Sequence, residues 1–349
     1  MLTKNSFVAI NQFFPFVNPM KGHIKSLYNH FEKWNPRFTV TDDSNVTKSL
    51  TMSDLASEKY IDEHLKKDII KLTSCREITF QTGKVTFTLQ IYHKDESLDY
   101  LIDMLMYALS FTTMIGPHRI NKVTMNIYLL DVKRVFDGDY IFDKEEVNGG
   151  SCLCLDTSCE IAIWRKEEIL KVSIHELIHG LSYDYRDDTP EIVDHYQGKY
   201  GITSPKMNTF EAYTEIWAEL IHSYLLARFF SFVQPTISVY DLFCANVGIE
   251  MLFSQYQSTK VLTLLDKNKD MNKETNVCAY YVIKTELYQD LDTFLGFCLQ
   301  HNKDIVKITE TTKYFDYLKG LPKVEEKKSK TNKYLRNTTR MTCLEIDLF

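Results

Sequence analysis

The residues His175-Glu176-Leu177-Ile178-His179 form an H-E-x-x-H pattern, whose residue types and spacing allow metal chemistry. Residues four apart on an α-helix lie about 40° apart around its axis, so both imidazoles can point at one ion. Glu176 is rotated by about 100° and can reach a metal-bound water without ligating the metal. Zinc lowers the pKa of such a water to near 7, where a carboxylate can accept its proton. The pattern predicts one Zn²⁺ ion held by His175 and His179, with Glu176 as the general base.

The segment that carries this pattern, residues 166–181, has the character of a buried helix. Apolar residues cover most of its surface, at positions Ile169, Val172, Ile174, Leu177, Ile178 and Leu181. The two histidines are therefore expected to face protein rather than bulk water. The alternative to a metal site is a pair of core histidines that bond to backbone carbonyls. That alternative predicts no bound metal and no effect of a chelator on the melting temperature.

A third metal ligand is expected from a later helix, residues 208–226. On its helical wheel Glu211 and Glu219 flank Glu215 at about 40° on either side, and His222 lies about 20° away. The rest of this segment is apolar, which is typical of a buried helix. A stripe of like charges inside a core is costly unless a positive charge lies against it, and a zinc ion with its histidines would supply that charge. The alternative is that the stripe faces solvent.

Each residue of this stripe has a candidate role. Asn208 and Glu211 have the spacing of a capping box, which gives Glu211 a local function at the start of the helix. Glu215 is therefore the predicted third ligand, with Glu211 as the next choice. Glu219 could accept a hydrogen bond that orients a ligand histidine, and His222 could stabilise the oxyanion or neutralise the stripe. A polar loop after the motif offers rival ligands: Asp184, Asp187, Asp188 and His195.

The set of His175, Glu176 and His179, followed by Glu215 and Glu219, resembles the zincin metallopeptidases of the glutamate-ligand branch, the gluzincins. In that branch a glutamate on a later helix completes the metal site, and an acidic residue follows four positions on. The resemblance implies hydrolysis of peptide bonds in a peptide or protein substrate. Less specifically, residues 147–181 resemble uncharacterised metallopeptidase-like proteins of large DNA viruses.

The resemblance leaves open which group stabilises the transition state. The tyrosine that would match seven residues before Glu215 is missing, since Asn208 stands there. The remaining candidates are tyrosines near the motif: Tyr183, Tyr185, Tyr196, Tyr200 and Tyr213. The resemblance also implies that the strand before the metal-binding helix, residues 160–165, is an edge strand that pairs with an extended substrate. Gly149 and Gly150 would let backbone approach closely. A plain structural hairpin is the alternative.

Two other functions fit the same residues. The first is a catalytically inactive protein of zincin fold with a structural or interaction role. The intact Glu176 argues against it, because a structural zinc site fills its fourth position with protein and needs no carboxylate there. The second is a zinc amidase that acts on a non-peptide substrate.

The elements that position these residues can be predicted from patterning. Residues 76–93 alternate apolar and polar side chains around a turn at 81–84, which predicts a β-hairpin. Residues 97–116 have helical spacing, residues 122–132 have the pattern of a strand, and Thr189-Pro190 is typical of a helix start. The predicted fold is α+β and zincin-like: a small mixed sheet packed on the active-site helix, with a mostly helical C-terminal region.

Four parts are expected along the chain. They are an N-terminal region of unknown role (1–75), a zincin-like catalytic core (76–235), a helical C-terminal region (236–320) and a basic, flexible tail (321–349). The net charge of −6 argues against a nucleic-acid partner. A signal peptide and an apolar run of about 18 residues are both missing, so an intracellular protein without a membrane span is expected, or a virion protein if the chain is viral. Its oligomeric state stays open.

The cysteines are expected to be free thiols. Eight cysteines in 349 residues are too sparse for a disulfide scaffold. Cys152, Cys154 and Cys159 lack the paired C-x-x-C spacing of structural zinc sites.

Overall fold

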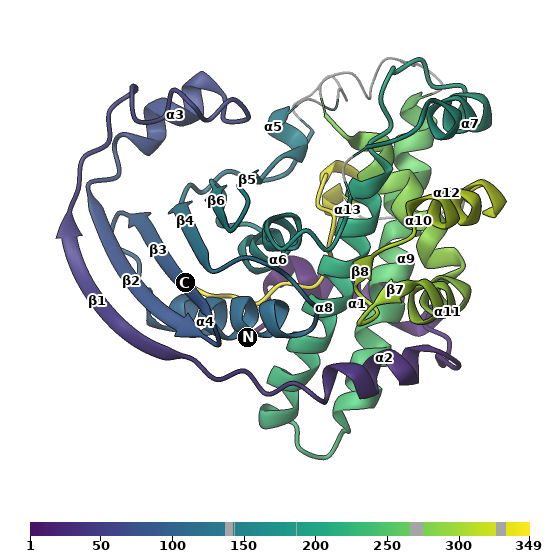
Figure 1. Cartoon of the computed structure of the whole chain (residues 1–349), viewed down its shortest axis with the longest axis horizontal. Helices are drawn as coiled ribbons and strands as arrows, with labels where there is room; N and C mark the ends of the chain where they lie inside the picture. Colours follow the sequence, from purple (N-terminus) through teal and green to yellow (C-terminus); the bar gives the residue numbers. More distant parts are fainter. Residues whose placement is uncertain (137–141, 143, 186, 266–274, 326–332) are drawn as a thin grey trace. The chain divides into compact units, whose positions relative to one another are not determined.

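The computed structural model describes residues 1–136, 142, 144–185, 187–265, 275–325 and 333–349. Part of the basic stretch predicted as a tail, residues 326–332, lies outside this description. The fold is α+β, as predicted, with a mixed sheet and many helices (Figure 1). The chain forms two compact units. The sheet unit comprises Trp34–Lys133, Asn148–Tyr183 and Leu348–Phe349, and the helical unit comprises Met1–Lys33, Arg134–Val147 and Asp184–Asp347.

The sheet unit is built on six strands in the order β1-β2-β3-β4-β6-β5. Neighbours β1/β2, β2/β3 and β5/β6 are antiparallel, whereas β3/β4 and β4/β6 are parallel, so the sheet is mixed. The strands are β1 (Thr39–Thr47), β2 (Ser74–Thr82), β3 (Val85–His93), β4 (Lys122–Tyr128), β5 (Gly150–Cys154) and β6 (Ser158–Ile163). The predicted hairpin is confirmed as β2 and β3, joined at Gly83, whose φ of +56° suits a tight turn.

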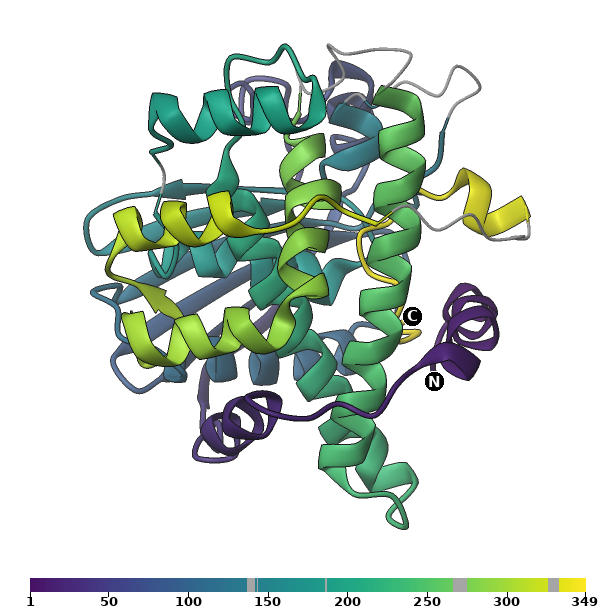
Figure 2. The ribbon, with the colours of Figure 1, turned by 90° about the vertical axis from the view of Figure 1, so that its right-hand side faces the viewer.

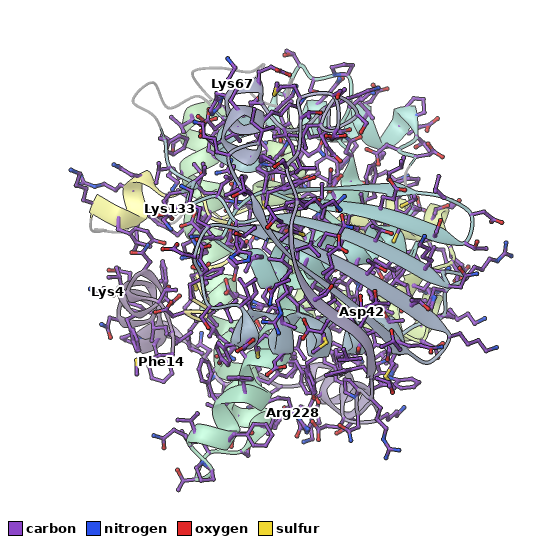
Figure 3. All side chains as sticks on the ribbon, turned by 90° about the vertical axis from the view of Figure 1, so that its left-hand side faces the viewer. Lys4, Phe14, Asp42, Lys67, Lys133 and Arg228 are labelled. Carbon is purple, nitrogen blue, oxygen red and sulfur yellow. The ribbon has the colours of Figure 1, made fainter. Side chains whose placement is uncertain are left out.

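Two strands of the sheet were not predicted. β1 has the sequence TVTDDSNVT and is mostly exposed, so it lacks the apolar alternation that identifies a half-buried strand. Figure 3 labels Asp42 on this strand, at one edge of the sheet. β5 begins at Gly150, where the glycine pair indicates only a turn. Both strands form by pairing with a neighbour, which a local pattern does not report.

Helices cover both faces of the sheet. α6 (Ile169–Gly180), which carries the H-E-x-x-H residues, packs on β5, on β6 and on α4 (Asp99–Met114). Both helices match the predicted segments. On the other face, Leu65 and Ile69 of α3 (Glu63–Ile69) join a buried cluster with Tyr92 and Trp164. α6 is therefore packed between the sheet and α4.

The helical unit is organised around two long helices, α8 (Thr209–Val233) and α9 (Val239–Leu265), which pack against each other (Figure 2). The π-helix η2 (Cys278–Ile283) and α10 (Lys284–Gln289) pack on both of them. The other elements are α1 (Lys4–Phe13), η1 (Phe14–Phe16), α2 (Ile24–Phe31), α5 (Lys144–Val147), α7 (Pro190–Tyr200), α11 (Leu291–His301), β7 (Asn302–Lys303), β8 (Lys307–Ile308), α12 (Thr311–Gly320) and α13 (Lys333–Asn337). The predicted helix start at Thr189-Pro190 is confirmed.

α8 is apolar on nearly every side, and its residues from Ala212 to Ala227 are buried. In the part of the chain that the structure describes, it is the single helix long and apolar enough to cross a membrane, and 67% of its apolar window is buried. This burial is typical of a core helix.

The structure divides the chain at other points than the sequence predicted. Residues 1–75 are not one region, because β1 and α3 belong to the sheet unit while α1 and α2 belong to the helical unit. The predicted core is likewise divided between Tyr183 and Asp184. Pairing of β1 with β2, and packing of α8 on α9, set these boundaries.

The C-terminal residues are not the flexible tail that was predicted. Glu250 of α9 accepts hydrogen bonds from the backbone N–H groups of Cys343 and Leu344, both at 2.9 Å, and Arg340 is fully buried. Met341 and Ile346 are buried too. The apolar residues Leu344 and Leu348 of this segment are buried as well, which the basic residues before it do not indicate.

Candidate metal centre

α6 brings the two predicted histidine ligands together. The Nε2 atoms of His175 and His179 lie 3.2 Å apart, and the ring centroids are 4.8 Å apart. Both side chains are buried. This arrangement follows from the i, i+4 spacing on a regular helix, which puts both side chains on one face.

The distance between these two nitrogens fits a shared metal ion. In tetrahedral coordination with Zn–N bonds of about 2.0–2.1 Å, two ligating nitrogens are about 3.3 Å apart. The same distance suits one hydrogen bond between two neutral imidazoles, with one ring donating and the other accepting. Two imidazoles are also a donor set that zinc prefers. The residues present therefore fit the predicted metal.

Glu176 lies directly against the backbone of β5. A Cβ atom at Gly150 would be 2.8 Å from both Cγ and Oε1 of Glu176, and 2.8 Å from a methyl group of Val172. A side chain at this position would displace Glu176 or Val172, so glycine is favoured there. The side chain of Glu176 thus lies beside the edge strand at Gly150, whereas the predicted approach of another backbone to Gly149 and Gly150 stays a prediction.

The edge strand next to α6 is β5, not the strand predicted from residues 160–165. That segment is β6, which lies between β4 and β5. Trp164 donates to the carbonyl oxygen of Gly149, and Leu155 donates to that of Ser158. Hydrogen-bonded and non-hydrogen-bonded pairs alternate along an antiparallel ladder, and the β5 residues of the non-hydrogen-bonded pairs direct their N–H and C=O groups away from β6. These residues are Gly150, Cys152 and Cys154. The 147–165 segment is thus a hairpin with an open outer edge within its own unit.

The remaining predicted site residues lie on α8, in the helical unit. Glu215, Glu219 and His222 are buried, so the stripe does not face solvent, and Glu211 is half-buried. α6 belongs to the sheet unit and α8 to the helical unit.

The predicted capping box at the start of α8 is wrong. The side chain of Asn208 makes no capping bond to the helix and instead donates to Oδ1 of Asn276 at 2.6 Å. Asp188 caps the helix, since its carboxylate accepts from the backbone N–H of Thr209 at 3.0 Å and from the Thr209 hydroxyl at 2.6 Å. The Asn208 half of the predicted capping box is therefore absent. Asp188, a rival ligand in the sequence, is used as the cap.

Glu219 has a partner that sequence patterning missed. Nζ of Lys284 on α10 donates to Glu219 at 2.5 Å and to the carbonyl oxygen of Met341 at 3.0 Å, and both charged side chains are fully buried. Burial lowers the pKa of Lys284, but the charges of Glu219 and Glu215 outweigh it and hold the pKa above its usual value. Lys284 therefore supplies positive charge to this part of the stripe. Lys284 lies 65 residues from Glu219, so helical spacing gives no signal for it.

The tyrosines considered for the transition state all have hydroxyl partners within their own unit. The Tyr183 hydroxyl lies within hydrogen-bond distance of three backbone carbonyls, of which that of Gly116 is nearest at 2.9 Å. Tyr196 and Tyr200 both donate to Glu286, and Tyr213 donates to the carbonyl oxygen of Val306. Tyr185 bonds to the Thr209 hydroxyl. Each of the five hydroxyls is therefore hydrogen-bonded in the structure, and a role in the transition state stays a prediction.

Comparison with known proteins adds one similarity. No family model matches the sequence, and no solved structure matches it. The chain is 23% identical over 218 residues to an uncharacterised protein, R210, of Acanthamoeba polyphaga mimivirus. The match covers 59% of this chain and 55% of that protein, so the chain spans little more than half the length of this relative. This relative is a viral protein without an assigned activity, so the similarity indicates no reaction or ligand for this chain.

Proposed function

We propose that the chain is a zinc-dependent peptidase in which His175 and His179 hold one ion and Glu176 is the general base. The observation that carries the proposal is the buried pair of Nε2 atoms 3.2 Å apart, on the same helix turn as a carboxylate fixed against Gly150. A carboxylate of α8 would complete the ligand set. Glu215 is the proposed residue, as the gluzincin resemblance implies, and Glu211 is the alternative.

The residues of the sheet unit account for the chemical steps. A bound zinc ion would polarise the scissile carbonyl and lower the pKa of the attacking water. Glu176 accepts the proton of that water and passes it to the leaving amine. The outward N–H and C=O groups of β5 would pair with an extended peptide beside Glu176, which orients the scissile bond. His222 is proposed to stabilise the oxyanion.

The metal site is tested by zinc content per chain, measured by elemental analysis of protein purified without chelator. Wild type should hold about one zinc, whereas His175→Ala and Glu215→Ala should hold much less. His301→Ala and Glu310→Ala are matched controls, because these two residues form an ion pair with each other elsewhere on the helical unit. Zinc kept in Glu215→Ala but lost in Glu211→Ala would reassign the third ligand. Well-folded wild type without zinc, even after zinc is supplied, would refute the proposal and favour core histidines.

Catalysis is tested separately with Glu176→Gln. This variant should keep its zinc and melting temperature and lose hydrolysis of a fluorescence-quenched peptide library, because glutamine cannot accept the proton. Hydrolysis that persists unchanged would rule out Glu176 as the base. Zinc without any hydrolysis in wild type, across peptide and non-peptide amide libraries, would favour the inactive zincin-fold alternative.

The proposed place of action is inside the cell or in a virion. All eight cysteines are free in the structure, which suits a reducing compartment. Fractionation of infected or expressing cells, with detection of the chain in each fraction, tests this location.

A further inference from the structure

Three cysteines gather on one face of the β5–β6 hairpin. The register sets Cys154 directly opposite Cys159, and Cys152 lies two residues before Cys154 on the same strand. Side chains two apart on a strand point to the same face, so all three thiols are on one side of the sheet. Sγ of Cys152 lies 3.6 Å from Sγ of Cys154.

α6 closes over these thiols. A Cβ atom at Gly180 would be 2.6 Å from Sγ of Cys159 and 3.6 Å from Sγ of Cys152, so a glycine is required where the helix passes over them. The Cys154 thiol donates to the carbonyl oxygen of His179, with an S···O distance of 3.3 Å. Cys159 is buried, whereas Cys152 and Cys154 are half-buried at the open edge. Cys152 and Cys154 are therefore partly accessible to a small reagent.

The ladder geometry at Cys154 and Cys159 suits a disulfide. The bond from Leu155 to Ser158 marks a hydrogen-bonded pair, so the next pair, Cys154 and Cys159, is a non-hydrogen-bonded one. Such pairs have Cα atoms about 4.5 Å apart and side chains that approach closely. A disulfide needs Cα atoms about 4.4–6.8 Å apart. Rotation of the two side chains can therefore join the sulfurs without a change of register.

We infer that the Cys154–Cys159 pair is an oxidative modification site, which a hydroperoxide converts to a cross-strand disulfide. One thiol gives two electrons to the peroxide and becomes a sulfenic acid, with release of water or an alcohol. The second thiol then attacks that sulfur, the S–S bond forms and the sulfenic oxygen leaves as water. The bond locks the turn at the end of the edge strand and removes the thiol that donates to His179. Formation of this disulfide does not depend on the proposed peptidase function.

The disulfide can be mapped on the folded wild-type chain. The protein is treated with hydrogen peroxide, unfolded in an alkylating reagent without reductant, and cut before Asp156, which separates Cys152 and Cys154 from Cys159. Alkylated thiols should fall from eight to six, because one disulfide removes two. Mass spectrometry should find the two peptides joined, and dithiothreitol should separate them.

Serine variants assign the partners. Cys154→Ser and Cys159→Ser should abolish the cross-link, whereas Cys152→Ser should keep it. Cys75→Ser is the matched control, since this buried cysteine belongs to the cluster on the opposite face of the sheet. Eight alkylated thiols after oxidation, a cross-link made by Cys152, or oxidation only to sulfinic acid would each overturn the inference. The wild-type map gives this answer even if a variant fails to fold.

Discussion

The helices α6 and α8 both bury ionisable side chains at helical spacing, but they compensate the cost in different ways. On α6, the two imidazoles are hydrogen-bonded to each other, with their Nε2 atoms 3.2 Å apart. On α8, Glu219 pairs with Lys284 inside the core of the helical unit, with Nζ 2.5 Å from Oε1. Spacing therefore shows which residues share a face, whereas the charge that balances them is set by tertiary contacts. On α6, the two Nε2 atoms have the separation that a shared metal ion requires.

The largest effect is expected from breaking the buried ion pair of α8. Lys284→Met should lower the free energy of unfolding by about 3–5 kcal/mol, because Glu219 is left as an uncompensated buried charge. Replacing both residues, as Lys284→Met with Glu219→Leu, should recover most of this loss. Urea unfolding at neutral pH measures both.

The control for this prediction is Lys319→Met, which removes a surface pair with Asp316. Its effect should stay within about 0.5 kcal/mol, as is typical of exposed positions. A Lys284→Met variant as stable as this control would mean that Glu219 takes up a proton at little cost, and the contrast between the two helices would disappear.

The second effect is zinc-dependent stability, which should belong to α6. At a free zinc concentration of a hundred times Kd, binding stabilises the folded chain by about 2.7 kcal/mol. The melting temperature of wild type should rise with zinc and fall with a chelator, and His175→Ala should show neither change. Thermal unfolding with and without zinc measures it. An equal zinc response in His175→Ala would place the metal elsewhere.

The third prediction concerns the fixed position of Glu176. Gly150→Ala should lower the free energy of unfolding by about 1–3 kcal/mol, because the added methyl group overlaps Glu176 and Val172. Gly198→Ala in α7 is the matched control. A methyl group there meets no atom within 4 Å, so it should stabilise the chain by about 0.5–1 kcal/mol through helix propensity. Guanidinium unfolding of both variants measures these effects. If both substitutions change the free energy of unfolding with the same sign, the packing described at Gly150 is contradicted.

The sequence predicted those helices and strands that have a local pattern of their own. The periodicity of α4, α6 and α8, the β2–β3 hairpin and the start of α7 all follow from patterns within about 25 residues. β1 was not predicted because its sequence is polar, and β5 was not predicted because it begins with glycine. The roles of Lys284 and Asp188 were not predicted, because each residue bonds to a partner that is distant in the chain: Lys284 to Glu219, and Asp188 to Thr209. The C-terminal segment was misjudged from its basic neighbours.

The smallest effect tests how α8 begins. Asp188→Ala removes the carboxylate that caps Thr209 and should cost about 1 kcal/mol. Asp188→Asn keeps an acceptor and should cost less. At the start of α7, among the described residues, the side chain of Thr189 makes no capping bond. Thr189→Ala should therefore cost less than Asp188→Ala in parallel urea unfolding curves.

The cap also carries a pH dependence with a definite sign. Burial raises the pKa of Asp188 above 3.8, although the bonds from Thr209 lower it in part. The folded chain then binds a proton more readily than the unfolded chain, so stability from this group falls as pH rises from 3.8 through the raised pKa. Asp188→Asn does not titrate and should lack this part of the pH profile. If the stability of wild type instead rises with pH where that of Asp188→Asn is flat, the bonds from Thr209 outweigh burial and the pKa of Asp188 is lowered.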